Sequence, residues 1–135
     1  MASIFSKIIA REIPSYTIAE NDRFYAFLDV FPLVHGHTLV VPKQEVDKLY
    51  DLNQEDLSKI LQFAQPIAKA IEKAFPCKRC GMSVIGLEVP HAHLHLVPIE
   101  TAEDLNFTRE KIKPTEAELK AAQGKILEQL KRMGY

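Results

Sequence analysis

The chain has 135 residues, of which 47% are hydrophobic and 26% are charged, and its formal net charge is -1 at pH 7. These values are typical of one globular domain over residues 1–135, and they exclude a strong electrostatic attraction to nucleic acid or to a membrane surface. Residues 1–7 lack the apolar core of a signal peptide, and no apolar run approaches the roughly 20 residues of a membrane span. We therefore expect a cytoplasmic protein.

The first third of the chain predicts a short helix followed by three strands. Apolar residues within 4–9 recur at helical spacing. Two extended runs, residues 16–18 and 23–29, are separated by the turn residues Asn21-Asp22, so they should form a hairpin. A third strand over residues 37–42 is rich in β-branched residues and ends at a proline.

A long helix is predicted after Asn53, which is a good N-cap residue. Its core-facing residues recur every three or four positions, and Phe75-Pro76 ends it. They are Leu57, Ile60, Leu61, Ala64, Ala68 and Ile71. Pro66 lies inside this pattern, where it removes a backbone donor, so a kink or a boundary is expected there.

The last part of the chain predicts two paired strands and a final helix. Residues 81–85 form one strand, residues 86–88 a tight connection, and the next apolar run an antiparallel partner. Thr115 and Glu118 form a capping box for a helix. Its apolar residues are Leu119, Ala122, Ile126, Leu127 and Leu130. Grouped strands with few helices indicate an α+β fold.

Three of the five histidines stand at alternate positions of the apolar run 90–98. Alternate residues of a strand share a face and repeat about every 6.6 Å, so His91, His93 and His95 should form a row. Imidazole has a pKa near neutrality, so this row can include a neutral nucleophile, a proton donor and a positively charged partner for an anion. The pattern favours phosphate chemistry.

A metal site is the alternative interpretation of the row, because zinc accepts three imidazoles. Side chains two apart on a flat strand diverge too far to reach one ion at about 2.0 Å, unless a bulge bends the strand. Cys77 and Cys80 form a single Cys-x-x-Cys pair. We expect two reduced thiols there, with a regulatory disulfide as the minor alternative, and neither a metal nor another cofactor.

Two blocks of the chain resemble the signature blocks of the histidine triad (HIT) superfamily. They read FLDVFPLVHGHTLVVPK over residues 27–43 and GLEVPHAHLHLVPI over residues 86–99. The segment 3–29 also resembles the start of the small histidine triad nucleotide-binding, or Hint-like, branch. The resemblance covers nearly the whole chain. It implies a five-stranded antiparallel sheet with one long helix and short N-terminal and C-terminal helices, and a homodimer that binds a purine nucleotide similar to AMP.

The resemblance also implies a role for each site residue. His93 would attack the α-phosphorus and become a nucleotidyl-histidine, with His91, His95 and His37 completing the catalytic set. Asp29 would accept hydrogen bonds from the ribose hydroxyls. An imidazolium at His95 or His37 is a candidate to offset charge on the phosphoryl oxygens. The expected nucleotide-binding residues are Phe5, Ile8, Phe27, Val30, Leu39, Glu88 and Val89. For the five apolar residues before Glu88, plain core packing explains the composition equally well.

The chain departs from its relatives at several positions. Leu87 stands where many relatives have Gln, and Glu88 where the nucleotide-binding branch often has Ser or Thr. A carboxylate at that place would repel a phosphate unless it were solvated, protonated or turned away. Ser3, Ser6 and Glu45 replace the two Cys and the His of zinc-binding relatives, so the structural zinc is expected to be missing. His35 is outside the matched pattern and is expected to be a loop residue.

Four functions are therefore weighed. The leading hypothesis is hydrolysis of a purine nucleoside 5′-phosphoramidate or a similar nucleotide conjugate. A dinucleoside polyphosphate hydrolase is the rival within catalysis, and a nucleotide-binding or scaffold protein with weakened chemistry is the rival outside it. Metal storage through the histidine row and the cysteine pair is a third class, which stoichiometric metal binding would support.

Overall fold

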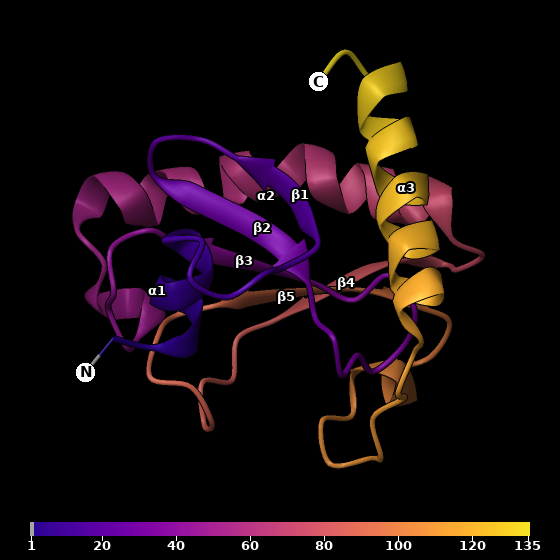
Figure 1. Cartoon of the computed structure of the whole chain (residues 1–135), viewed down its shortest axis with the longest axis horizontal. Helices are drawn as coiled ribbons and strands as arrows, with labels where there is room; N and C mark the ends of the chain where they lie inside the picture. Colours follow the sequence, from indigo (N-terminus) through magenta and orange to yellow (C-terminus); the bar gives the residue numbers. More distant parts are fainter. Residues whose placement is uncertain (1) are drawn as a thin grey trace.

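The computed structural model describes residues 2–135, which form an antiparallel sheet with the strand order β1-β2-β3-β5-β4 (Figure 1). The strands are β1 (Thr17–Glu20), β2 (Phe24–Leu28), β3 (Thr38–Pro42), β4 (Arg79–Ser83) and β5 (Leu94–Ile99). The helices are α1 (Ile4–Ile9), α2 (Gln54–Ala74) and α3 (Glu116–Arg132), with two 3-10 turns, η1 (Leu49–Asp51) and η2 (Ala102–Leu105). The predicted α+β class, the five strands and the expected hairpin of β1 with β2 are confirmed.

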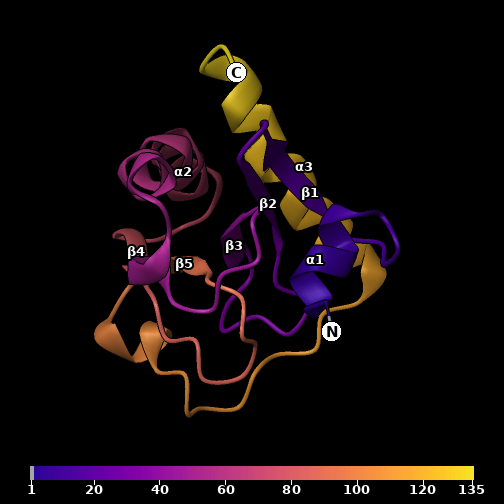
Figure 2. The same cartoon turned by 90° about the vertical axis from the view of Figure 1, so that its left-hand side faces the viewer.

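The central strands are covered on both faces, and their side chains alternate between two cores. Phe24 and Leu28 of β2 pack in the larger core with α2 and α3. Tyr25 and Phe27, between them, pack in a smaller core with Phe5 of α1. Figure 2 shows α2 and α1 on opposite sides of the sheet. The site described below lies on the α1 side.

Helix α2 begins where it was predicted, since the Asn53 side chain accepts the backbone N–H of Asp56 at 2.8 Å. A kink or a boundary was expected at Pro66, and the boundary is wrong, because the helix continues without a break to Ala74. A proline costs about 3 kcal/mol inside a helix, and the burial of aliphatic side chains on both sides of it outweighs that cost. Leu61 was predicted to face the core, but it is 57% exposed on the outer face of α2.

The strand predicted for the histidine row begins later than expected. Strand β5 starts at Leu94, so His91 and His93 precede it and only His95 lies within it. Before the strand, the backbone N–H of Ala92 donates to the carbonyl of Val46 at 2.7 Å, and the imidazole of His91 donates to the carbonyl of Pro42 at 2.8 Å. Strand β4 also ends two residues earlier than predicted, so residues 84–93 form a long connection. The antiparallel pairing of β4 with β5 is confirmed.

Helix α3 starts with the predicted capping box of Thr115 and Glu118. Its buried side chains join the larger core against α2, and Gln123 donates to the carbonyl of Thr17 at 2.9 Å, which ties the helix to β1. Leu127 was predicted to be in the core but is 40% exposed. Within residues 2–135, none of the helices combines the length and apolar character needed to cross a membrane.

Candidate active site

Two cavities on the α1 side of the sheet share the side chains of Asp29, Glu88, His93 and His95. The larger, of about 290 Å³, lies between α1 and strands β2 and β3, and we call it the α1 cavity. The smaller, of about 200 Å³, lies between residues 85–88 and the connection after η2, and we call it the loop cavity. His93 and His95 therefore stand where two different ligand groups can meet.

The α1 cavity gathers every apolar residue that was predicted for the base slot. These residues are Phe5, Ile8, Phe27, Val30 and Leu39, and Val89 joins them. Most of them also belong to the smaller core, whereas Val30 is 42% exposed at the rim. The rings of Phe5 and Phe27 meet edge to face with centroids 5.5 Å apart. Core packing and cavity lining are thus two roles of the same side chains.

The proton position on His93 follows from a hydrogen bond to the backbone. Its Nδ1 lies 2.7 Å from the carbonyl oxygen of His91, which can only accept, so Nδ1 carries the proton. In the neutral ring, Nε2 then keeps its lone pair. Every buried side-chain nitrogen or oxygen among residues 2–135 has a hydrogen-bond partner. Since His93 Nε2 has none, it is open to the cavities as a nucleophile.

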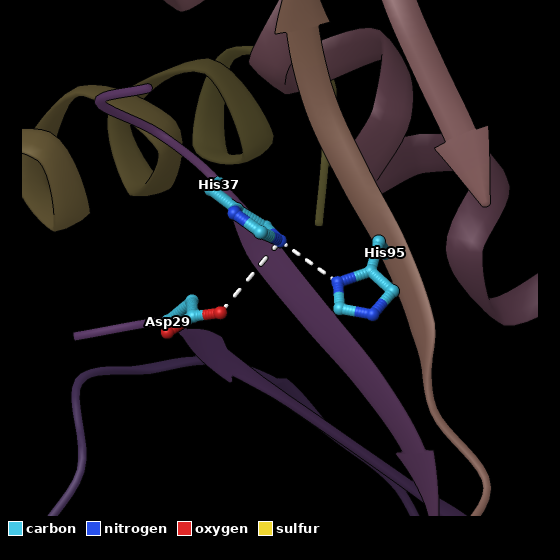
Figure 3. Close-up of side chains that lie close together, drawn as sticks. All are labelled: Asp29, His37 and His95. Carbon is cyan, nitrogen blue, oxygen red and sulfur yellow. Dashed lines mark hydrogen bonds and ion pairs between the residues drawn. The ribbon is translucent and has the colours of Figure 1, made fainter. Parts of the chain in front are cut away.

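His37 and His95 are linked by a hydrogen bond, and the proton positions on both rings are defined. The backbone N–H of Leu33 donates to His37 Nδ1 at 3.0 Å, so the proton of the neutral ring is on Nε2. That Nε2 donates to His95 Nδ1 at 2.9 Å, as Figure 3 shows. The remaining proton of His95 is therefore on Nε2, which has no partner among the described residues and can donate to a ligand.

His37 and His95 were candidates for an imidazolium that offsets charge during the reaction, and in the unliganded protein both rings favour the neutral form. Burial lowers the pKa of each ring to about 3, and each ring also lies near another histidine. Removing an imidazolium from water is unfavourable, and the Asp29 carboxylate, 3.8 Å from His37 Nε2, does not reverse this effect. Both rings are neutral at pH 7, so they contribute oriented N–H groups to the site and no charge.

Asp29 reaches the site from the end of β2 and lines both cavities. Burial raises the pKa of its carboxyl to about 6, although the N–H of Phe31 donates to Oδ1 at 2.9 Å and opposes that rise. Its Oδ2 lies 3.8 Å from His37 Nε2, which is too far for a hydrogen bond (Figure 3). The carboxylate retains capacity to accept hydrogen bonds from a ligand.

His91 lies outside both cavities, although it was predicted to flank the nucleophile. Its Nδ1 accepts the hydroxyl of Ser3 at 2.7 Å, and burial lowers its pKa. Glu45 accepts the Ser3 backbone N–H and the Ser6 hydroxyl, each at 2.6 Å, and these bonds lower the pKa of Glu45 to about 2. Two hydroxyls, a carboxylate and an imidazole lack the thiolates of a structural zinc site, so this set does not fit that metal. The hydrogen bonds among these four side chains link the start of α1 to His91.

The residues that depart from the relatives lie at the mouth of the loop cavity. Glu88 lines both cavities and is exposed, so its carboxylate is solvated. Leu87 is 89% exposed. Gly86 has a φ of 72°, in the left-handed region that suits glycine. His35 does not line these cavities; its Nε2 lies 3.9 Å from Glu118 at the start of α3.

Sequence reasoning missed one wall of the loop cavity. Phe107, Thr108 and Lys111, from the connection between η2 and α3, line it together with the histidines. The Phe107 ring lies edge-on to the His95 ring, with centroids 4.5 Å apart. The available signal was the length of this connection, because long ordered connections often carry functional residues.

One group among residues 2–135 has the geometry to hold a metal ion, and it differs from the predicted histidine row. Potential ligand atoms of Asp29, His37 and His95 lie within 4.8 Å of one another. An ion there would displace the proton that the two histidines share. Cys77 and Cys80 are both free and take no part in this group, and burial raises the pKa of Cys80 to about 12.

The sequence and the fold match a known class of protein. The HIT domain family model covers residues 10–102, so the chain belongs to the HIT family, as the two sequence blocks indicated. Adenosine 5′-monophosphoramidase HNT1 of Saccharomyces cerevisiae is 39% identical over 98 residues, which are 72% of this chain and 62% of the yeast protein. This chain therefore matches less than two thirds of that relative.

Two further comparisons extend over more of the molecule. A HIT-like protein of Borreliella burgdorferi is 34% identical over 113 residues, 78% of this chain and 81% of that protein. The crystal structure of a HIT-like protein from Bartonella henselae superposes with a TM-score of 0.80 at 35% identity, covering 94% of this chain and 95% of that one. The α+β architecture is therefore the HIT fold.

Proposed function

We propose that this protein is a nucleotide-binding hydrolase that cleaves purine nucleoside 5′-phosphoramidates, or related nucleotide conjugates, at the α-phosphate. The observation that carries this proposal is Nε2 of His93, which has no hydrogen-bond partner among the described residues and is open at the junction of the two cavities. The named activity of the yeast relative, an adenosine 5′-monophosphoramidase, supports the choice of substrate.

The proposed binding mode follows from the chemical character of the side chains that line each cavity. A purine fits the α1 cavity because aromatic and aliphatic side chains line it. The ribose then lies at Asp29, whose ionised carboxylate accepts hydrogen bonds from the hydroxyls. The phosphorus lies between His93 and His95, and the leaving group extends into the loop cavity.

The reaction proceeds in two displacements. Nε2 of His93 forms a bond to the α-phosphorus as the bond from phosphorus to the leaving nitrogen breaks, and that nitrogen takes up one proton from solvent. A water then forms a bond to phosphorus, the bond to Nε2 breaks, and one proton returns to solvent. The products are the free amine and a nucleoside 5′-monophosphate.

His95 acts on the phosphoryl group through its Nε2–H. In the neutral ring this hydrogen is directed away from His37, because Nδ1 already accepts from His37 Nε2. A donor whose position is set before the reaction stabilises charge that develops on phosphoryl oxygens without reorganising. His37 serves as a positioning residue for this donor.

The test compares hydrolysis of adenosine 5′-monophosphoramidate by the wild type, His93→Ala and His35→Ala, at neutral pH with a chelator present. We expect His93→Ala to be at least about 10³-fold slower than the wild type. His35→Ala is the matched control, since this exposed histidine does not line either cavity, and it should retain full activity. Equal activity of His93→Ala and the wild type would contradict the proposal.

Two rival functions give different outcomes in the same assay. Faster turnover of diadenosine polyphosphate than of the phosphoramidate would select a dinucleoside polyphosphate hydrolase. Tight binding of adenosine monophosphate by a wild type that turns over neither substrate would select a nucleotide-binding or scaffold protein.

We also propose that the protein is a homodimer that associates through α2 and the edge of β4. Leu61 on α2 and Met82 on β4 are 57% and 44% exposed, and together they line one shallow cavity. Sedimentation of the wild type should give twice the chain mass, and Leu61→Glu should give a single chain. Leu127→Glu, at an exposed position of α3, is the control that should stay dimeric. A wild type that sediments as one chain would refute this proposal.

A further inference from the structure

Lys111 is the one lysine or arginine that lines either cavity among residues 2–135. It is half-buried, and its Nζ donates to the carbonyl of Phe107 at 2.7 Å. Asp29 and Glu88 line the same cavity, yet Lys111 has no carboxylate within 4.0 Å among the described residues. An ammonium group offers three donors, so the cavity contains a positive charge with donors to spare.

The segment that carries Lys111 is held firmly against the site. Arg109 Nη2 donates to the carbonyl of Leu33 at 2.6 Å, and the N–H of Ile112 donates to the carbonyl of Pro32 at 3.1 Å. The Phe107 ring packs on His95 from the same segment. These contacts on both sides of Lys111 set the position of its charge before a ligand arrives, which is how a specificity residue avoids an ordering cost.

Lys111 lies in the loop cavity, which receives the leaving group in the proposed binding mode. Gly86, Phe107 and Lys111 line the loop cavity but not the α1 cavity, where the nucleoside lies in the proposed binding mode. The phosphorus lies at the histidines that the two cavities share. A group attached to that phosphorus and directed away from the nucleoside therefore approaches Lys111.

We propose that Lys111 determines the leaving-group specificity of this site by binding an anionic group, such as a phosphate, attached to the α-phosphate of the nucleotide. This assignment rests on the proposed function for the direction of the nucleotide. The family match ends at residue 102, before this segment, so Lys111 belongs to the part of the chain outside the matched domain.

Glu88 has the opposite effect on the same cavity. Its carboxylate is exposed at the mouth, where water screens its charge, whereas Lys111 is half-buried beside the histidines. The positive charge should therefore dominate inside the cavity. Replacing Glu88 with Gln should increase the preference for an anionic leaving group, in the direction opposite to a Lys111 substitution.

The test measures binding of AMP and ADP by calorimetry to the wild type, Lys111→Gln and Lys113→Gln, and checks afterwards that ADP is unchanged. A hydrogen bond to a charged group corresponds to roughly a tenfold or larger change in affinity. We expect Lys111→Gln to weaken ADP binding at least about tenfold more than AMP binding. Lys113, exposed and two residues away, is the matched control and should change neither affinity.

The outcomes separate this assignment from the proposed function. Equal losses for AMP and ADP would place Lys111 at the α-phosphate, and equal losses in both lysine variants would reduce the effect to net charge; either result, or no loss at all, overturns the assignment. The binding measurement needs no turnover. If the phosphoramidate is not hydrolysed but ADP binding still depends on Lys111, the hydrolase proposal falls and the anion site stands.

Discussion

Nε2 of His37 donates to Nδ1 of His95 across 2.9 Å, and this bond leaves His95 with a single proton directed at the ligand side. The backbone N–H of Leu33 holds the far nitrogen of His37, so neither ring can reverse its tautomer without losing a hydrogen bond. The orientation of the His95 Nε2–H donor is thus determined by the backbone N–H of Leu33, which acts on it through His37.

Replacement of His37 tests whether its hydrogen bond to His95 contributes to catalysis. His37→Leu removes the donor to His95, so we expect kcat to fall about tenfold or more with little change in KM. His37→Gln retains a side-chain N–H that can donate to His95 and should recover much of the loss. Steady-state kinetics check this, with circular dichroism to verify folding. Equal kcat values for the two variants would exclude a contribution from the hydrogen bond between His37 and His95.

Acid should destabilise the fold mainly through the neutral rings of His37 and His95, and the lowered pKa of His91 acts in the same direction. The folded pKa values of about 3 for His37 and His95 lie below the unfolded value near 6.5, so between these limits the unfolded state binds more protons and stability falls as pH falls. Asp29, with a folded pKa of about 6, opposes this between its unfolded value of 3.8 and pH 6. The net loss between pH 7 and pH 5 should be on the order of 2 kcal/mol.

Urea denaturation at pH 7 and pH 5 measures this loss. Glu45 and the other carboxylates with lowered pKa values titrate below this window, so they do not obscure the histidines. His37→Gln removes one of the two groups and should make stability less dependent on pH. Stability that is constant from pH 7 to pH 5 in the wild type would contradict the neutral state of both rings.

Binding of adenosine should depend on the ionisation of Asp29. As pH falls through about 6, the carboxyl becomes protonated and loses capacity to accept hydrogen bonds from the ribose. The dissociation constant of adenosine should therefore rise severalfold between pH 7.5 and pH 5. Adenosine carries no phosphate that titrates in this range, and Asp29→Asn should bind it weakly without this pH dependence. Parallel pH profiles for both proteins would disprove the role of Asp29.

Two glycines with left-handed backbone should respond differently to alanine. Gly36, next to His37, has a φ of 96°, and a Cβ there would lie 2.5 Å from the ring of Phe75. Gly36→Ala should cost about 2 to 4 kcal/mol, from backbone strain together with overpacking. Gly86 has a φ of 72° with open space around it, so Gly86→Ala should cost only about 1 to 2 kcal/mol. Thermal unfolding of both variants gives the comparison, and equal losses would rule out the steric contribution of Phe75.

Local patterns predicted most of the fold because they depend on neighbouring residues. The caps at Asn53 and Thr115 and the apolar spacing of α2 were sufficient to place two helices within a residue or two. Where the histidine strand begins was not predictable in this way. The residues just before it bond to distant parts of the chain, as His91 does to the carbonyl of Pro42, which is 49 residues away.

The membership of the site was more predictable than its charge. Alternation and family resemblance pointed to His93 and His95, and the resemblance to Asp29, and these three residues line one pair of cavities. The neutral state of His95 arises from burial, which is a property of the folded molecule. Lys111 was missed because no local pattern links a lysine in a connection to a histidine on a strand.

The hydrogen bonds of Ser3 have a practical consequence for handling the protein. Its N–H and hydroxyl bind Glu45 and His91, so the first turn of the chain is part of the wall behind the nucleophile. An affinity tag fused ahead of it would begin beside the α1 cavity. The other terminus lies at the far tip of α3, with Tyr135 74% exposed (Figure 1). Attachment through that end leaves both cavities of the chain open for surface-immobilised binding measurements.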